Sequence, residues 1–527
     1  MKNIVRNILV IGLLSVLMVG CTDGFEDLNK NPKKSSVISP DLVFPYVTWA
    51  AADVYHEPYE LGHVLGVGLW SQYLASDMSS DRYQYNDSWT SGGLWSPYYW
   101  RVVKNVVEVE KVMDDNPKCV AEFQMMRIMQ ALAFSKLTDT YGDIPYFEAG
   151  KGIEKPNFDT QKEVYYDMFR ELTEAVNILK SDLGVQVDIS SSDYLYSGDV
   201  QKWIKFANSL RLRCAMRISF IDPEKAKQEG EAALAAGVME TMEDGATHRT
   251  DGADWSSLGY PLWVSVDWEE YVLSATLINI LEKESTVVDP REVLYAGKTS
   301  AFVKTGKGPE YIGAPNGLAY ADWHGENDLT YGDYSTVNGL MLYPNWNSKG
   351  ISHAYGERVE KRYPVMRYSE VCFLKAEAAL RGWVGAGNAK TNYEDGIRAS
   401  LAEAREGVDR SLYSSDNDNT YIMTGAVAWD QSGDFEKNLK KIITQKWLAV
   451  FPLGHEGWAE FRRTGYPDLT PVIVNVESAL KEGEFIKKVS YPDDEKRNNP
   501  NVDFTKLNNG QGDGANVRVW WDTSRCK

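Results

Sequence analysis

Apolar side chains recur at the spacing of an α-helix in several long segments of the chain. In 121–141, the residues Met125, Ile128, Met129 and Leu132 form one stripe, with further apolar residues beside it. A stripe this wide indicates a helix that is buried on most of its sides. The same spacing predicts further helices at 164–179, 202–219, 223–236, 367–381 and 435–450.

Two long regions lack this periodicity and are rich in polar and aromatic residues. Residues 240–362 carry many Gly, Asp, Asn, Tyr and Trp, with one helical piece near 271–281, and residues 466–527 carry many Pro, Asn and Gly. Irregular stretches of this length are usually functional loops or disordered segments, and disordered segments are poor in aromatic residues. We therefore expect two ordered, irregular segments beside a helical scaffold at about 41–239 and 363–465.

The first residues of the chain have the pattern of an export signal. A positively charged start is followed by an apolar run at 8–19, which is shorter than the ~20 residues of a spanning helix but is typical of a secretory signal. The run ends at Gly20-Cys21, and a small residue directly before a cysteine at this place resembles a bacterial lipobox, whose cysteine is acylated. We predict a lipoprotein signal peptide at 1–20 and a lipidated tether over 21–40; an ordinary signal peptide with a coincidental cysteine is the alternative.

The negative charge of the chain argues against some partners and against attachment to the membrane by charge alone. The 527 residues carry 56 Lys and Arg against 75 Asp and Glu, a net charge of −19 at pH 7. Nucleic acid is a poor match, because phosphate binding depends on clustered cations. Cleavage after residue 20 would remove two cations and no acid, which gives −21. Anionic lipid repels such a chain, so we expect acyl chains on Cys21 to supply the attachment.

Conventional catalytic and metal-binding motifs are missing from the sequence. A phosphate-binding loop ending at 297–299 fails because Glu292 stands where its first glycine belongs. The Asp- and Asn-rich segment 416–420 lacks the glycine and the last carboxylate of an EF-hand, so only a looser Ca²⁺ site stays open there. We expect no other metal, no catalytic residue and no cofactor. His455 has no companion ligand near it in the sequence and is expected to act as a capping or hydrogen-bonding residue.

Four cysteines remain after export, and we expect them to be buried free thiols. None of them stands in a CxxC pair, and a chain of this length does not depend on a disulfide framework. Two of them lie inside apolar helical patterns, where a free thiol behaves as a small apolar residue. The four are Cys119, Cys214, Cys372 and Cys526.

Aromatic residues gather in the irregular segments, next to Asp and Asn. Aromatic faces pack on the C–H face of a sugar ring while polar neighbours take its hydroxyls, and apolar walls with a few polar groups are typical of a ligand site. For a single tryptophan, packing of the loop itself is the commoner role. We predict one shallow, exposed site lined by Trp89 and Trp95 together with one or more of Trp263, Trp268, Trp323, Tyr331, Tyr334 and Trp346. In contrast, Trp203, Trp447 and Trp458 lie in helical patterns and are expected in the core.

Seven short motifs, in order along almost the whole chain, carry a resemblance to a known family. They are the lipobox followed by 25–32, and then 138–146, 203–213, 363–370, 446–451, 456–467 and 491–501. Each motif is weak alone, but the seven in this order resemble the SusD/RagB-like nutrient-binding outer-membrane lipoproteins of the Bacteroidetes type. The motifs have structural explanations: Glu460, Arg462 and Arg463, for example, are expected to form charge pairs that hold the last helix. We therefore interpret them as markers of the fold.

The resemblance implies a mostly α-helical, SusD-like domain over 41–527, with four tetratricopeptide-like helix pairs and an irregular, loop-rich ligand-binding subdomain at about 240–362. It implies a surface-exposed lipoprotein of the outer membrane that binds oligosaccharides without catalysis and partners a SusC-like TonB-dependent porter. Ligand residues differ in position within the family, so none is transferred. A peptide-binding lipoprotein of the same fold stays open, as does a lipid-anchored glycosidase, because 75 acids offer many pairs that spacing does not single out.

Overall fold

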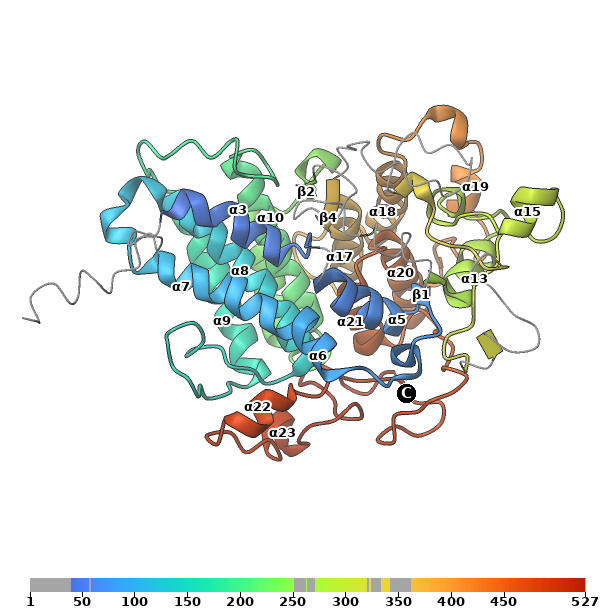
Figure 1. Cartoon of the computed structure of the whole chain (residues 1–527). Helices are drawn as coiled ribbons and strands as arrows, with labels where there is room; N and C mark the ends of the chain where they lie inside the picture. Colours follow the sequence, from blue (N-terminus) through green and yellow to red (C-terminus); the bar gives the residue numbers. More distant parts are fainter. Residues whose placement is uncertain are drawn as a thin grey trace, which may run out of the picture. The chain divides into compact units, whose positions relative to one another are not determined.

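The computed structural model divides the chain into a unit of residues 1–39 and a unit of residues 40–527. It describes residues 39–55, 58–250, 262, 271–319, 322–323, 333–341 and 362–526. The second unit is built mainly from helices, as the periodicity predicts (Figure 1). In the part of the chain that is described, no helix combines the length and hydropathy that crossing a membrane requires.

The scaffold consists of long helices joined by shorter ones. Its helices are α3 (Pro40–Ala51), α5 (Gly68–Trp70), α6 (Asp87–Thr90), α7 (Lys104–Glu110), α8 (Val120–Tyr141), α9 (Gln161–Leu179), α10 (Val200–Arg217), α11 (Pro223–Ala236), α17 (Tyr368–Leu380), α18 (Ala389–Ala404), α19 (Asp418–Met423), α20 (Phe435–Ala449) and α21 (Gly454–Thr464). Three π-helical segments lie between α3 and α7: Tyr59–Val67, Ser91–Trp95 and Tyr98–Val103. All six helices predicted from periodicity are present, with bounds within three residues of the expected ones.

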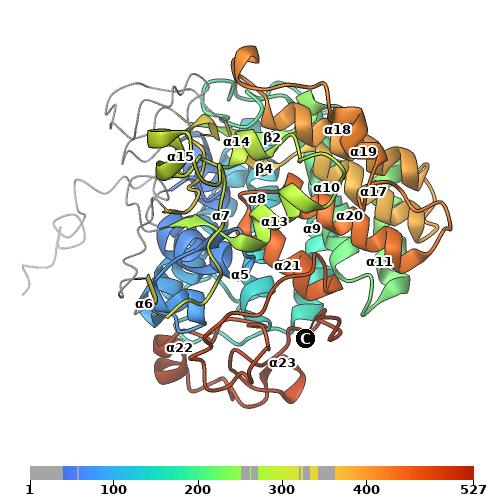
Figure 2. The ribbon, with the colours of Figure 1, turned by 90° about the vertical axis from the view of Figure 1, so that its right-hand side faces the viewer.

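Consecutive long helices pack against each other as pairs, namely α8 with α9, α10 with α11 and α17 with α18. Figure 2 shows α10, α11, α17, α18 and α20 gathered on one side of the unit. Local sequence sets the helix ends. Thr160 and Glu163 form a reciprocal capping box that starts α9, and Gly142, with φ +85°, ends α8 in a conformation that a side chain disfavours. The pairing agrees with the expected helix pairs, and a tetratricopeptide-like repetition of them stays a prediction.

Two small antiparallel sheets and three short helices make up the described part of the loop-rich region. Strand β1 (Leu74–Ala75) pairs with β3 (Val272–Leu273), and β2 (Ala246–Arg249) pairs with β4 (Arg362–Met366). The helical piece expected near 271–281 begins later, at α13 (Ala275–Lys283), because the residues before it form β3 and Ser274 caps the helix by accepting from the Leu277 N–H. The region also contains α14 (Glu292–Tyr295) and α15 (Ser300–Thr305).

The C-terminal segment is irregular but held in place, as its aromatic content predicts. It contains only the short α22 (Asp493–Asn498) and α23 (Leu507–Gly510) and lies at the bottom of the view in Figure 1. The Tyr491 hydroxyl donates to the Asp143 carbonyl at 2.8 Å, and the Trp521 indole N–H donates to the Asp139 carboxylate at 2.7 Å. These bonds tie the segment to the end of α8.

The core contains the side chains that helical patterns placed there. Trp203, Trp447 and Trp458 are all buried, as predicted. The Trp447 indole also donates to the Ser71 carbonyl at 3.2 Å, which satisfies its polar atom. The four cysteines outside the signal region are buried and free, which confirms that expectation.

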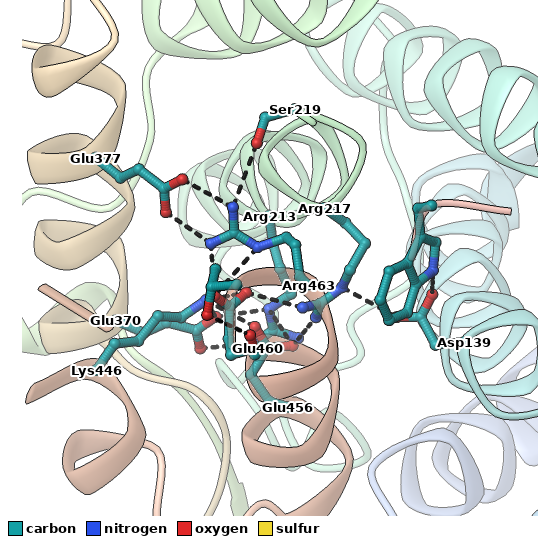
Figure 3. Close-up of polar contacts among 12 residues, drawn as sticks. Asp139, Arg213, Arg217, Ser219, Glu370, Glu377, Lys446, Glu456, Glu460 and Arg463 are labelled. Atoms are coloured by element: carbon teal, nitrogen blue, oxygen red, sulfur yellow. Dashed lines mark hydrogen bonds and ion pairs between the residues drawn. The ribbon is translucent and has the colours of Figure 1, made fainter. Parts of the chain in front are cut away.

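A cluster of buried charges joins five helices at the centre of the scaffold (Figure 3). Arg217 of α10 contacts the carboxylates of Asp139 at 3.2 Å, Glu456 at 2.5 Å and Glu460 at 2.8 Å. Lys446 of α20 contacts Glu456 at 2.7 Å and Glu460 at 3.2 Å. With the pairs described next, we call this cluster the buried ion network.

The network continues into α17 through two further arginines. Arg213 pairs with Glu370 at 2.6 Å, and Arg463 pairs with Glu377 at 2.7 Å and Glu460 at 2.6 Å. The charge pairs expected for Glu460 and Arg463 are therefore confirmed.

The expectation for Arg462 was wrong, since its Nη1 donates to the carbonyl oxygens of Asp139 and Lys487 at 2.7 and 2.9 Å. Its guanidinium lies 3.5 Å from the centre of the Trp458 ring. Arg462 thus links α21 to the C-terminal segment through backbone carbonyls.

We predict that Glu377→Gln strongly destabilises the fold, because it leaves Arg463 and Arg381 without their shared carboxylate. Removing one partner of a buried ion pair costs about 3–5 kcal/mol of unfolding free energy. Burial alone raises the pKa of Glu377, but the charges of Arg463 and Arg381 outweigh it and hold the pKa at about 2. The stabilisation is thus present above about pH 4.5 and is lost as the pH falls toward 2, so the difference between variant and parent should shrink in acid.

Chemical denaturation at several pH values measures this difference. Glu108→Gln is the matched control, because Glu108 forms a surface pair with Lys111, and its effect should stay within about 0.5 kcal/mol. Equal effects of the two variants would contradict a supporting role for the network.

Candidate ligand-binding site

Two segments that are far apart in the sequence, residues 76–90 and 312–319, meet beside the β1–β3 pair. The carboxylate of Asp81 accepts from the Asn316 side-chain amide at 2.6 Å and from the Gly317 backbone N–H at 2.8 Å. Arg82 follows it and donates to the Leu318 carbonyl at 2.8 Å. We call these contacts the loop clamp.

A third segment, residues 472–476, runs along both loops. The backbone N–H groups of Ile473 and Val476 donate to the carbonyls of Asn316 and Arg82 at 3.0 and 3.1 Å. Gly317 has φ +78°, and a Cβ there would lie 2.6 Å from the Cβ of Val472. Only glycine allows this close approach, so the three segments are locked together at that point.

Asp81 is an acid with a perturbed pKa, but it is closed off from any ligand. Its side chain is buried, and burial raises its pKa to about 7 against the opposing effect of its hydrogen bonds from Asn316, Gly317 and Ser76. Both oxygens are already used within the loop clamp. Asp81 therefore serves as a hydrogen-bond acceptor that holds the loops together.

Trp323 and Tyr334 belong to the packing of this junction. Trp323 is 0% exposed and packs with Ala75, Val272 and Ala314, with Tyr334 edge-on at 5.4 Å. The expectation of an exposed Trp323 ring was wrong, because the indole fills the small core beneath the loops. Tyr334 is half-buried and keeps part of its ring accessible.

Trp89 and Trp95, the two tryptophans placed first in the predicted site, differ in their exposure. Trp95 is only 5% exposed, since its ring packs against Tyr99 at 5.0 Å and Tyr141 at 4.8 Å. The expectation of an exposed Trp95 was therefore also wrong. Trp89 is 37% exposed on α6, a short helix that Asn86 caps by accepting from the Ser88 N–H at 2.9 Å.

The structure brings together only part of the predicted aromatic site. The loop clamp joins the loop that leads to Trp89 with the loop that carries Trp323 and Tyr334. Trp263, Trp268, Tyr331, Trp346 and Cys21 lie outside the described residues. The assignment of a ligand to these aromatic residues stays a prediction.

The prediction from sequence missed two apolar side chains and one aromatic one. Ile473 and Val476 are exposed on the segment that runs along the loop clamp; an apolar run inside a polar, irregular segment was the available signal. Trp100 is exposed as well, and the Arg101 guanidinium lies 4.6 Å from its ring centre. Trp100 lies in the π-helix Tyr98–Val103, outside the two loops that form the clamp.

The structure bears on two expectations about metal ligands. The carboxylate of Asp418 in segment 416–420 accepts from both terminal nitrogens of Arg405 at 2.6 and 2.7 Å. A looser Ca²⁺ site in this segment stays a prediction. The His455 Nε2 lies 3.3 Å from the Tyr98 hydroxyl, as expected of a hydrogen-bonding histidine. His455 does have companions: Asp53 and His63 lie against it in space, although they are about 400 residues away in the sequence. Spacing along the chain carries no signal for contacts of this range.

Comparison with known proteins identifies relatives over almost the whole chain. Residues 41–522 match the model of a family described as "SusD-like: Susd and RagB outer membrane lipoprotein". No curated protein matches the chain at a significant level.

Solved structures agree with this match. A chitin-binding SusD homologue from Flavobacterium johnsoniae is 28% identical, with a TM-score of 0.74 over 92% of this chain and 99% of that one. A SusD homologue from Bacteroides ovatus is 28% identical, with a TM-score of 0.73 over the same shares. A chitin-binding protein is 25% identical, with a TM-score of 0.74 over 92% and 100%.

We predict that the stability of the loop clamp falls as the pH rises from about 4 to about 7. The pKa of Asp81 is raised in the folded chain, so the folded state binds the proton more tightly than the unfolded state across this window. Relative to Asp81→Asn, which does not titrate, the parent should lose stability up to about pH 7 and stay level above it. The loss should reach about 4 kcal/mol at most, at about 1.36 kcal/mol per pKa unit.

Melting temperatures of parent and variant across this pH range measure the effect. Asp494→Asn, which removes an exposed carboxylate, should follow the parent at every pH. Parallel curves for the parent and Asp81→Asn would contradict a buried, titrating clamp.

Proposed function

Because the chain belongs to the SusD-like family of outer membrane lipoproteins, we propose that it binds oligosaccharides at the cell surface without cleaving them. In this proposal it is anchored in the outer membrane through Cys21 and delivers its ligand to a SusC-like TonB-dependent porter. The observation that carries the proposal is an exposed indole, Trp89, beside a rigid loop junction on a fold shared with chitin-binding proteins.

Trp89 has the surroundings that a sugar ring requires. The polar residues Gln84, Asn86 and Ser88 around it are exposed and can exchange hydrogen bonds with hydroxyl groups. Tyr334 offers a second, half-buried ring on the loop across the clamp. We propose that Trp263, Trp268, Tyr331 and Trp346 complete the site.

The described acids support binding over hydrolysis. A glycosidase needs two carboxyl groups that both reach the scissile bond. Asp81, the acid of the loop clamp, is buried with both oxygens occupied. Glu370, Glu377, Glu456 and Glu460 are buried and paired with cations in the ion network.

We predict that Trp89→Ala weakens oligosaccharide binding ~2- to 12-fold without lowering the melting temperature. Stacking on a ring contributes roughly 0.5–1.5 kcal/mol beyond area burial, and tenfold in affinity corresponds to about 1.4 kcal/mol. Calorimetric titration of the full chain with a panel of glycans, starting with chitin oligosaccharides, measures the change. Trp100→Ala, at an exposed tryptophan outside the two loops, is the matched control and should bind normally.

The same experiment separates the alternatives. Normal binding by a folded Trp89→Ala variant would move the site elsewhere on the surface. A peptide that binds where no glycan does would favour a peptide-binding lipoprotein. Cleavage products after prolonged incubation would favour a glycosidase.

We predict that Cys21→Ser leaves the chain exported but without acyl chains, since the acyl chains supply the membrane affinity of an acidic protein. Metabolic labelling with a fatty-acid probe, followed by separation of membrane and soluble fractions, tests this. The parent should be labelled and membrane-bound, and the variant unlabelled and released. Unchanged labelling of Cys21→Ser would contradict the lipoprotein assignment.

A further inference from the structure

Three side chains with metal-binding atoms meet inside the scaffold, away from the candidate ligand site. Asp53 follows the end of α3, His63 lies in the π-helix Tyr59–Val67, and His455 lies in the first turn of α21. Their side chains are 7%, 4% and 9% exposed, and one ligand atom from each lies within 4.8 Å of the others. Two imidazoles and a carboxylate form a ligand set that zinc and related ions accept.

A glycine at the helix contact allows this meeting. A Cβ on Gly454, the residue before His455, would lie 2.8 Å from the backbone nitrogen of Gly68. It would also lie 2.9 Å from the carbonyl carbon of Val67, at the end of the π-helix. A larger residue at position 454 would push α21 away from the π-helix, so the two histidines owe their proximity to this contact. A π-helical segment is itself uncommon and is often found at functional sites.

His63 is the side chain of this cluster whose two ring nitrogens make no hydrogen bond and can bind an ion. Its Nε2 lies 3.1 Å from an Asp53 carboxylate oxygen, but the contact lacks hydrogen-bond alignment, and neither ring nitrogen has a hydrogen-bond partner. A neutral imidazole carries one donor and one acceptor, and leaving both unused in the interior is costly. The ring is fixed by stacking on Tyr59 at 4.9 Å and by edge contact with His455 at 4.6 Å.

We propose that Asp53, His63 and His455 bind a divalent transition-metal ion of the Zn²⁺ type. Bonds of about 2.0–2.2 Å to a tetrahedral ion separate neighbouring ligand atoms by little more than the 3.1 Å found between His63 and Asp53. The three residues line a cavity of ≈ 40 Å³, which is larger than the space of roughly 10–15 Å³ that one water needs. The Tyr98 hydroxyl, 3.3 Å from the His455 Nε2 and donating to the other Asp53 oxygen at 2.7 Å, lies next to the ion position.

Lys136 of α8 competes with the ion for the same carboxylate. Its ammonium contacts the Asp53 oxygen that faces His63 and donates to the Ala51 carbonyl at 2.8 Å. A divalent cation at the site has to displace this ammonium or bind beside it against charge repulsion. Lys136 therefore sets the affinity, and its removal should strengthen metal binding while all three ligands stay in place.

The test is a titration of the full chain with Zn²⁺ and with Co²⁺ after removal of metals by a chelator. We expect one ion per chain by calorimetry and an intense visible absorption band of tetrahedral Co²⁺. His63→Gln should weaken Zn²⁺ binding more than ~100-fold, beyond the cost of losing an outer-shell partner. His248→Gln is the matched control, because His248 is a buried histidine in β2, outside the cluster, and it should bind as the parent does.

Lys136→Met keeps the experiment decisive if His63→Gln fails to fold. The methionine retains the apolar stem and removes the charge, so Zn²⁺ should bind at least about tenfold more tightly. Affinity unchanged by Lys136→Met, binding retained by a folded His63→Gln variant, or no binding by the parent would each overturn the proposal. None of these outcomes bears on the glycan site, which uses other residues.

Discussion

Burial of charge is the constraint on which the rest of this structure depends. Five carboxylates and four cations are transferred from water into the centre of the scaffold when the chain folds. They come from α8, α10, α17, α20 and α21. An ion without its partner in the interior costs several kcal/mol. Each helix therefore has to bring its charge to the same place, and helices more than 200 residues apart in the sequence are fixed against one another.

A scaffold held in this way leaves long loops free to carry function. Loops on a rigid support are where binding residues usually lie. As in the core, a buried acid holds distant segments together in the loop clamp. The buried Asp81 is satisfied by donors from one distant loop, and that contact fixes the segment that leads to Trp89. The cavity at Asp53 and His455 is also lined by Arg217 and Glu456, so the proposed metal site borders the network itself.

Aromatic residues show where prediction from sequence succeeds and where it fails. Trp447 was placed in the core because its neighbours repeat at helical spacing, and it is buried. Trp95 and Trp323 stand among polar residues in the sequence, yet both are buried as well. Local polarity reports on neighbours along the chain, whereas contacts from elsewhere in the fold bury these two indoles.

The sequence by itself determined the helices, their ends and the family, because periodicity, capping residues and short motifs act over a few positions. Thr160 and Glu163 cap α9 from three residues apart, and such a pair is visible in the sequence. Only the tertiary structure decided which side chains meet across the fold. His455 and His63 are brought together by the close contact of Gly454 in α21 with the end of the π-helix Tyr59–Val67, and the Asp81–Asn316 bond joins loops 235 residues apart. The physical reason is range: backbone propensity is local, whereas packing and charge pairing depend on distance in space.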